Sequence, residues 1–105
     1  MKFTIDECLA KLPGPANDKW KNGVWDTEPH KIGEVSLVFF APERDDFQSF
    51  HEENEYYFIA RGSGELVLDG ERFGCEAGDA FFVTAKILHR FENFTADFAT
   101  WAIFF

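Results

Sequence analysis

Hydrophobic positions near the start of the chain repeat with a helical period, which is lost beyond residue 20. Thr4 and Glu7 have the spacing of a helical capping box. The apolar residues of this stretch fall on one face of a helix, namely Ile5, Cys8, Leu9 and Leu12. The Pro-Gly-Pro sequence at 13–15 stops the helix. The pattern therefore predicts one short amphipathic helix with Cys8 on its buried face.

Beyond the helix, short runs rich in aromatic and β-branched residues alternate with turn residues. These runs predict strands, which we expect over residues 33–40, 47–51, 55–61, 64–68, 79–84, 87–91 and 98–105. Asp69-Gly70 lies between Leu66-Val67-Leu68 and Glu71-Arg72-Phe73, and a two-residue Asp-Gly turn at this place indicates a tight β-hairpin. Many short strands with evenly spaced turns are typical of a β-sandwich or barrel. We expect one domain, in which residues 1–32 form the helix and an extended arm packed on a barrel of residues 33–105.

Three pairs of adjacent phenylalanines place apolar side chains on both faces of a strand: Phe39-Phe40, Phe81-Phe82 and Phe104-Phe105. One face of each strand can fill the barrel interior, and the other face needs cover. We therefore expect a homodimer that buries the second face. The alternative is that the helix and the segment 20–25 supply all of the cover.

Composition and charge exclude several classes of function. The chain has 105 residues, of which 19 are acidic and 10 basic, and its formal net charge is −9. It has no cluster of Lys or Arg, so we expect neither nucleic-acid binding nor attraction to an anionic membrane. No apolar run approaches the roughly 18 residues of a transmembrane helix. The acidic N-terminal stretch is unlike a signal peptide and two cysteines make no disulfide framework, so we expect a cytoplasmic protein with free thiols.

Two histidines and one glutamate form the candidate site. Alternate residues of a strand share a face, so a strand that ends at His51 would direct Ser49 and His51 the same way. Glu55 begins the next predicted strand after a short turn, and along that strand Glu55, Tyr57 and Ile59 would face the same side. His89 lies in a strand with apolar neighbours. In a closed barrel, His51, Glu55 and His89 would converge in an apolar interior. An uncompensated carboxylate is costly in such a place, so Glu55 needs a cation, a proton or a hydrogen-bond donor.

A divalent metal ion would compensate the carboxylate of Glu55. Two histidines and one carboxylate with open positions suit Fe(II), and Mn, Ni, Co or Zn could also occupy the set. Ser49 is a poor ligand, so water or substrate would complete the coordination. The alternative is a metal-free barrel in which His51 and His89 hydrogen-bond Glu55.

The first of these two regions resembles the first sequence motif of the cupin superfamily. That motif is a Gly, five residues, His-x-His, three or four residues, a Glu, six residues and a Gly. His51, Glu55 and Gly62 match it in register, while Ser49 stands at the first His and Glu43 at the leading Gly.

The region around His89 resembles the second cupin motif, which is a Gly, five residues, Pro-x-Gly, two residues, a His, three residues and an Asn. Gly78, His89 and Asn93 match it, while Thr84 replaces the Pro and Lys86 the Gly. The resemblance covers about two thirds of the chain, from about residue 33 to 105, and is to small single-domain bacterial cupins. It implies an all-β jelly-roll barrel, or double-stranded β-helix, with the short N-terminal helix outside it.

We expect Ser49, Tyr57, Phe91 and Trp101 to line a pocket beside the metal set. A jelly-roll hosts many activities, so three functions stay open. The first is a metal-dependent enzyme of the dioxygenase, decarboxylase or isomerase type. The second is a metal-free isomerase or epimerase, resembling sugar-nucleotide cupins, with His51 or His89 as base and Tyr57 as acid. The third is a sensor or binding module. We favour a metal-binding cupin that takes a small-molecule ligand or substrate.

Overall fold

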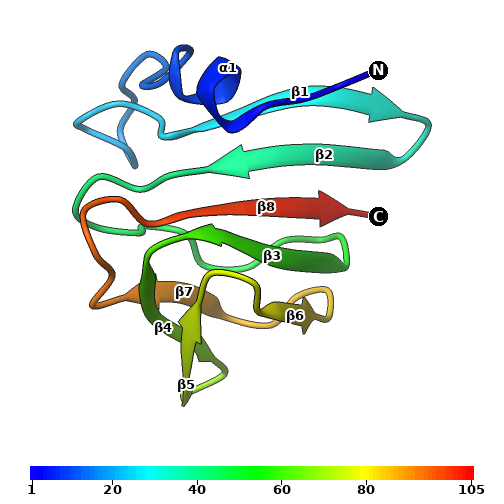
Figure 1. Ribbon diagram of the computed structural model, residues 1–105. Helices are drawn as coiled ribbons and strands as arrows, with labels where there is room; N and C mark the ends of the chain where they lie inside the picture. Colours follow the sequence, from blue (N-terminus) through cyan, green and yellow to red (C-terminus); the bar gives the residue numbers. More distant parts are fainter.

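A computed structural model describes all residues of the chain, 1–105. It contains one helix, α1 (Ile5–Leu9), and eight strands. The strands are β1 (Asp26–Ile32), β2 (Val35–Phe40), β3 (Glu55–Arg61), β4 (Ser63–Leu68), β5 (Glu71–Glu76), β6 (Ala80–Val83), β7 (His89–Glu92) and β8 (Ala99–Phe104). Antiparallel pairing forms a five-stranded sheet in the order β1-β2-β8-β3-β6 and a three-stranded sheet in the order β5-β4-β7 (Figure 1).

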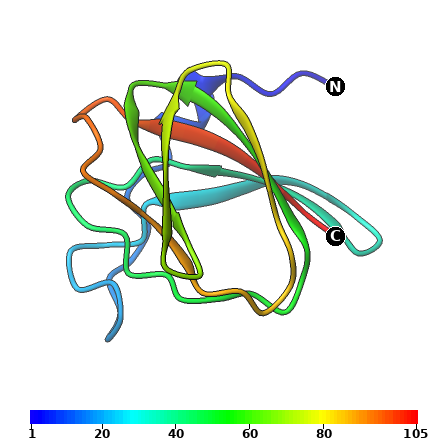
Figure 2. The ribbon, with the colours of Figure 1, turned by 90° about the horizontal axis from the view of Figure 1, so that it is seen from below.

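The core lies between the two sheets, which face each other across it (Figure 2). Seven of the strands contribute to it, through Phe40, Tyr57, Ile59, Leu66, Cys75, Val83, Phe91 and Ala102. Within β3 the buried residues alternate with exposed ones, so that Glu55, Tyr57 and Ile59 point inward. The predicted all-β jelly-roll architecture, with this alternation in β3, is confirmed.

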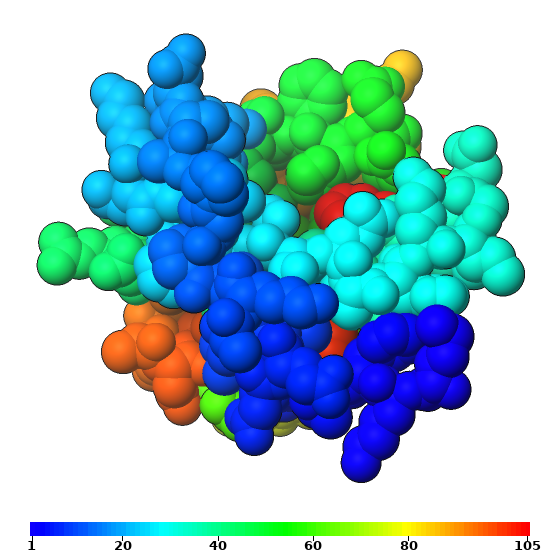
Figure 3. Space-filling model, turned by 90° about the horizontal axis from the view of Figure 1, so that it is seen from above, coloured from blue at the N-terminus to red at the C-terminus, as the bar shows by residue number.

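The N-terminal segment covers part of the outer face of the five-stranded sheet (Figure 3). The Thr4 side chain accepts a hydrogen bond from the backbone N–H of Glu7 at 3.1 Å, as the capping pattern predicts. Cys8 packs against Phe39 and Ala99, so the helix covers the face of β2 opposite to the core. Both cysteines are buried and unpaired. No helix has the length and apolarity needed to cross a membrane.

The β4–β5 hairpin is built by Asp69 and Gly70, as predicted. Both residues have positive φ, 48° for Asp69 and 86° for Gly70, which is the requirement of a type I′ turn. The register places Leu68 opposite Glu71 directly before and after the turn. Because the twist of this turn matches the twist of paired strands, two residues suffice to reverse the chain.

The predicted strand at 47–51 is wrong, since residues 41–54 contain no regular element. The segment still lies beside the second motif, because the backbone oxygens of Ser49 and His51 accept hydrogen bonds from the backbone N–H groups of His89 and Lys86, each at 2.7 Å. The Asp46 carboxylate accepts hydrogen bonds from the backbone N–H groups of Gln48 and Phe91. The Asp46 side chain thus accepts the hydrogen bond from the Phe91 N–H group that a backbone carbonyl of a paired strand would otherwise accept. The turn that Asp46 forms with Gln48 prevents regular strand pairing in this segment.

Strand β1 was not predicted, because its sequence is polar and contains Pro29. It lies at the edge of the five-stranded sheet and pairs only with β2. The register shifts between Thr27 and His30, where Pro29 falls. A proline is tolerated at a sheet edge or a bulge, because no neighbouring strand needs a hydrogen bond from its backbone nitrogen there.

Candidate metal centre

Three different parts of the fold bring His51, Glu55 and His89 together. Glu55 is the first residue of β3 and His89 the first of β7, while His51 belongs to the irregular segment 41–54. One ligand atom from each residue lies within 4.8 Å of the others. The structure therefore assembles the predicted set, although His51 reaches it from a loop and not from a strand.

The side chains of His89 and Glu55 are in contact in the interior of the fold. The Nε2 atom of His89 lies 3.1 Å from Oε1 of Glu55, and both side chains are at most 2% exposed. The Nδ1 atom of His89 lies 2.9 Å from the carbonyl oxygen of Ile87. Because a carbonyl oxygen only accepts, Nδ1 carries a proton, and in the neutral ring Nε2 directs a lone pair towards the carboxylate.

Neither Nε2 of His89 nor Oε1 of Glu55 has a hydrogen-bond partner with acceptable geometry. The two atoms are close enough to form an ion pair if His89 is protonated, but they are not well aligned for a hydrogen bond. A buried nitrogen and a buried carboxylate oxygen without hydrogen bonds lower the stability of the fold. A divalent ion held by both atoms satisfies them together, so the donor set fits a metal.

His51 forms the outer side of the set. Its ring centre lies 5.1 Å from that of His89 and 4.8 Å from that of Phe104. Its Nε2 atom lies 3.1 Å from Oε1 of Gln48. His51 is half-buried, whereas Glu55 and His89 are buried.

Burial and mutual contact shift the pKa values of all three groups. Burial raises the pKa of Glu55, against the lowering effect of His89. Burial also lowers the pKa of His51, and the neighbouring His89 lowers it further. For His89, burial lowers the pKa, but the contacts with Glu55 and the Ile87 carbonyl outweigh burial and the pKa is raised. His51 is therefore held in the neutral form, which is the form that ligates metal ions.

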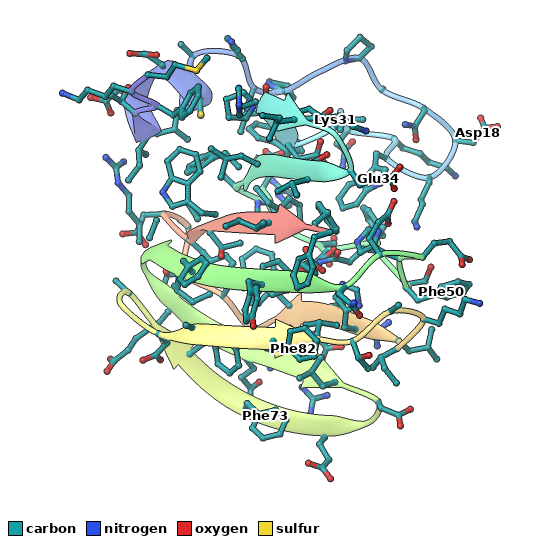
Figure 4. The ribbon with its side chains drawn as sticks, turned by 90° about the vertical axis from the view of Figure 1, so that its right-hand side faces the viewer. Asp18, Lys31, Glu34, Phe50, Phe73 and Phe82 are labelled. Carbon is teal, nitrogen blue, oxygen red and sulfur yellow. The ribbon has the colours of Figure 1, made fainter.

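A cavity of about 340 Å³ opens beside the set. His51, Glu55 and Tyr57 line it, together with the apolar side chains of Trp20, Val38, Phe40, Ala102 and Phe104. Charged residues line the rest, namely Lys19, Asp26, Glu28, Lys31 and Glu53. In Figure 3 atoms of β8 (red) are visible between the β1–β2 hairpin (cyan) and the green segment before β3. Figure 4 shows Lys31 on β1 near this hairpin.

The four residues predicted to line the pocket do not lie together in the structure, and only Tyr57 lines this cavity. Tyr57 lines the cavity and is 1% exposed, and its hydroxyl lies 3.3 Å from Oε1 of Gln48, to which it donates a hydrogen bond. Burial raises the pKa of Tyr57 well above its usual value, so the phenol keeps its proton. Ser49 is exposed and lines a separate pocket, Phe91 lies in the core, and Trp101 packs against Phe39 in the cluster under α1.

Sequence reasoning missed Gln48 and the cavity walls supplied by residues outside the motifs. Gln48 follows the turn at Asp46, and its side chain enters the cavity that Ser49 was expected to line. Trp20 and Lys19 come from the arm, and Lys31 from the unpredicted strand β1. No periodic pattern marks these positions, although the tryptophan in an otherwise polar stretch was a usable signal.

Comparisons with known proteins agree with this geometry. The family model described as a cupin domain matches residues 36–104. A search of curated protein sequences finds no match. Among solved structures, a cupin 2 conserved barrel domain protein from Salinispora arenicola has a TM-score of 0.66 at 21% identity, covering 76% of this chain and 73% of its own.

Two further solved structures share the architecture. KdgF from a Halomonas species has a TM-score of 0.65 at 17% identity, covering 75% of this chain and 76% of its own. Streptomyces PAC13, as a variant with uridine, has a TM-score of 0.66 at 17% identity and covers 99% of this chain and 79% of its own. These identities are low, so the three likenesses establish the fold and leave the activity to the site itself.

Proposed function

Because the chain belongs to the cupin domain family, we propose that it holds a divalent metal ion through His51, Glu55 and His89 and takes a small molecule into the cavity beside it. The observation that carries the proposal is the pair of buried, unpartnered atoms, Nε2 of His89 and Oε1 of Glu55. The metal is Fe, Mn, Ni, Co or Zn, since imidazole and carboxylate ligands suit all five. When bound, such an ion supplies Lewis acidity towards an oxygen of the small molecule.

The protein's own residues define what the cavity accepts. The aromatic side chains of Trp20, Phe40 and Phe104 offer a flat apolar surface, and Lys19 and Lys31 offer positive charge among acidic neighbours. This combination suits a small molecule that has both a ring or apolar part and polar substituents. The solved complex of a PAC13 variant with uridine, a molecule of that kind, supports a ligand of this size. Dioxygenase, decarboxylase and isomerase chemistry all remain compatible with the proposed ion.

A metal-free function is the second candidate, and the raised pKa of His89 favours it. If His89 is protonated, its positive charge compensates Glu55 without an ion, although their atoms are poorly aligned for a hydrogen bond. The same cavity would then serve a binding module or sensor, or an isomerase in which a histidine moves the proton. Tyr57 would hold a proton for the ligand in such a reaction, because burial keeps the phenol protonated.

Metal content distinguishes the two candidates. Protein purified without a chelator or a metal-affinity tag, then loaded with each of Fe, Mn, Ni, Co and Zn and desalted, is expected to retain about one equivalent of at least one of them. Mass spectrometry of the metals measures this directly. A protein that stays empty after all five loadings would refute the metal site and leave the metal-free candidate.

We also infer that the protein is a homodimer. Four aromatic residues at one end of the outer face of β3, β6 and β8 remain exposed: Tyr56, Phe58, Phe82 and Phe105, at 42%, 43%, 49% and 42%. We call them the aromatic patch. The ring of Tyr56 lies 5.2 Å from that of Phe82 and 5.5 Å from that of Phe105, so the patch is continuous. α1 covers the neighbouring part of this face but not the patch.

A second copy of the chain fits the patch, because an aromatic surface repeated on two copies can pack on itself about a two-fold axis. A standard interface buries roughly 800 Å² per partner, which several aromatic side chains can supply. We expect sedimentation at micromolar concentration to give twice the 12.1 kDa mass of the chain. Phe82→Glu should give monomers, whereas Phe73→Glu, on β5 of the other sheet (Figure 4), should not. A native chain that sediments at 12.1 kDa would contradict the dimer.

A further inference from the structure

Gln48 enters the cavity from the irregular segment beside His51. Its Oε1 atom lies 3.1 Å from Nε2 of His51 and 3.3 Å from the hydroxyl oxygen of Tyr57. The neighbouring Ser49, which occupies the position of the first motif histidine, is exposed and lies outside this cavity. The polar group that the fold presents at this place in the site is therefore an amide oxygen.

The direction of the Gln48 amide is fixed by a buried carboxylate. The Nε2 atom of Gln48 donates to Oδ2 of Asp46 at 2.5 Å, and Asp46 is only 6% exposed. The same carboxylate accepts the backbone N–H groups of Phe91 at 2.8 Å and of Gln48 at 3.0 Å. Because a carboxylate only accepts hydrogen bonds, the amide nitrogen must face Asp46 and the amide oxygen must face His51.

We propose that Oε1 of Gln48 is the fourth protein ligand of the metal, in place of the histidine that the motif position Ser49 lacks. The proposal rests on the proposed metal function of the site. Adjacent ligands of an octahedral ion with bonds of about 2.1 Å lie about 3.0 Å apart. Two atom pairs already have nearly this separation, Oε1 of Gln48 with Nε2 of His51 and Oε1 of Glu55 with Nε2 of His89, both at 3.1 Å.

The contacts of Gln48 suit the change that metal binding requires. In the metal-free protein the amide oxygen can accept a hydrogen bond from the Nε2–H group of His51, and both atoms give up that hydrogen bond when they turn to the ion. His51 then carries its proton on Nδ1, and the Tyr57 hydroxyl still donates to the amide oxygen. Tyr57 and Asp46 become positioning residues that hold the ligand from two sides.

An amide oxygen in place of an imidazole changes which ion the site prefers. Oxygen ligands suit harder ions such as Mn²⁺, whereas imidazole suits Zn, Cu, Ni and Fe. The native set of two histidines, one glutamate and one glutamine is therefore expected to retain Mn²⁺ better, relative to Zn²⁺, than a Gln48→His variant does. If Gln48 only stabilises the loop, the substitution Gln48→His should not change the preference between Mn²⁺ and Zn²⁺.

The test measures Mn²⁺ affinity by electron paramagnetic resonance in the full chain and its variants. Gln48→Ala should weaken Mn²⁺ binding about tenfold or more, while Ser49→Ala, one residue away and outside the cavity, should leave it unchanged. Gln48→Glu separates a ligand from a structural role. It keeps an oxygen at the metal but cannot donate to Asp46, so a ligand role predicts affinity at or above native and a purely structural role predicts the loss seen in Gln48→Ala.

Besides a loss of affinity in Gln48→Glu, two results would overturn the assignment, and they are distinguishable. If the native protein binds Mn²⁺ and Gln48→Ala binds it equally well, Gln48 is not a ligand and the three-residue site stands. If the native protein binds none of the five metals, the proposed function and this inference fall together. Circular dichroism of each variant checks that the fold is retained, and the Co²⁺ absorption spectrum, changed in Gln48→Ala but not in Ser49→Ala, provides a second readout.

Discussion

Alanine at Glu55, His51 or His89 is expected to lower metal retention by about two orders of magnitude in each case. Each of the three proposed ligands comes from a different segment, so no neighbouring side chain replaces a lost one. Loss of even an outer-shell partner typically costs 10- to 100-fold in affinity, and loss of a ligand costs at least as much. The metal-to-protein ratio after loading and desalting measures the effect. His30→Ala is the control, because His30 lies on β1 beside Phe3 and does not line the cavity.

Glu55→Gln is the most informative variant of this series. It removes the only negative charge of the set and so should weaken metal binding nearly as much as Glu55→Ala. In a metal-free barrel the same change exchanges a buried charge for a neutral amide of equal size, and the protein should tolerate it. Metal should also raise the melting temperature of the native protein by mass action but leave that of Glu55→Gln unchanged. Equal retention by Glu55→Gln and the native chain would contradict the metal account.

Gly62→Ala is expected to destabilise the fold by about 3 kcal/mol or more. Gly62 joins β3 to β4 with φ of 72°, a conformation that L side chains rarely adopt. An added Cβ would lie 2.3 Å from Oγ1 of Thr95 and 3.0 Å from the backbone Cα of Phe98, so the neighbouring turn must move. Total stabilities are about 5–15 kcal/mol, so this loss is a large fraction. Thermal unfolding followed by circular dichroism should show a melting temperature lower by about 10 °C or more.

Gly78→Ala is the matched control, because Gly78 is the other motif glycine with positive φ, at 97°. An added Cβ at Gly78 meets nothing within 4 Å, so only the backbone conformation is strained. We expect a loss of about 1–2 kcal/mol. The difference between the two variants isolates the close approach of Gly62 to the 95–98 turn. Equal losses would show that backbone strain alone explains the motif glycines.

Local periodicity predicted the parts of this fold whose neighbours are close in sequence. The capping pair Thr4 and Glu7, the type I′ turn at Asp69-Gly70 and the alternation of Glu55, Tyr57 and Ile59 in β3 all follow from contacts within a few residues. The motif spacing of His51, Glu55 and His89 also predicted which residues meet.

The region around the site could not be predicted in the same way, because distant contacts determine it. The Asp46 carboxylate accepts a hydrogen bond from the backbone N–H group of Phe91, 45 residues away, and this contact replaces regular strand pairing. Because the segment is not a strand, the expected shared direction of Ser49 and His51 is lost, and Gln48 and His51 line the cavity while Ser49 does not. Strand β1, which is polar and contains Pro29, was not predicted for a related reason. Its extended conformation depends on pairing with β2 and not on its own sequence pattern.

The location of a bound ion tests the central claim most directly. Crystals of Mn²⁺-loaded protein, measured for anomalous scattering, should show one strong peak inside the barrel, within about 2.0–2.3 Å of Nε2 of His89, a carboxylate oxygen of Glu55 and a ring nitrogen of His51. Anomalous peaks confined to surface carboxylates, with Nε2 of His89 hydrogen-bonded to Glu55 and no density between them, would contradict the account.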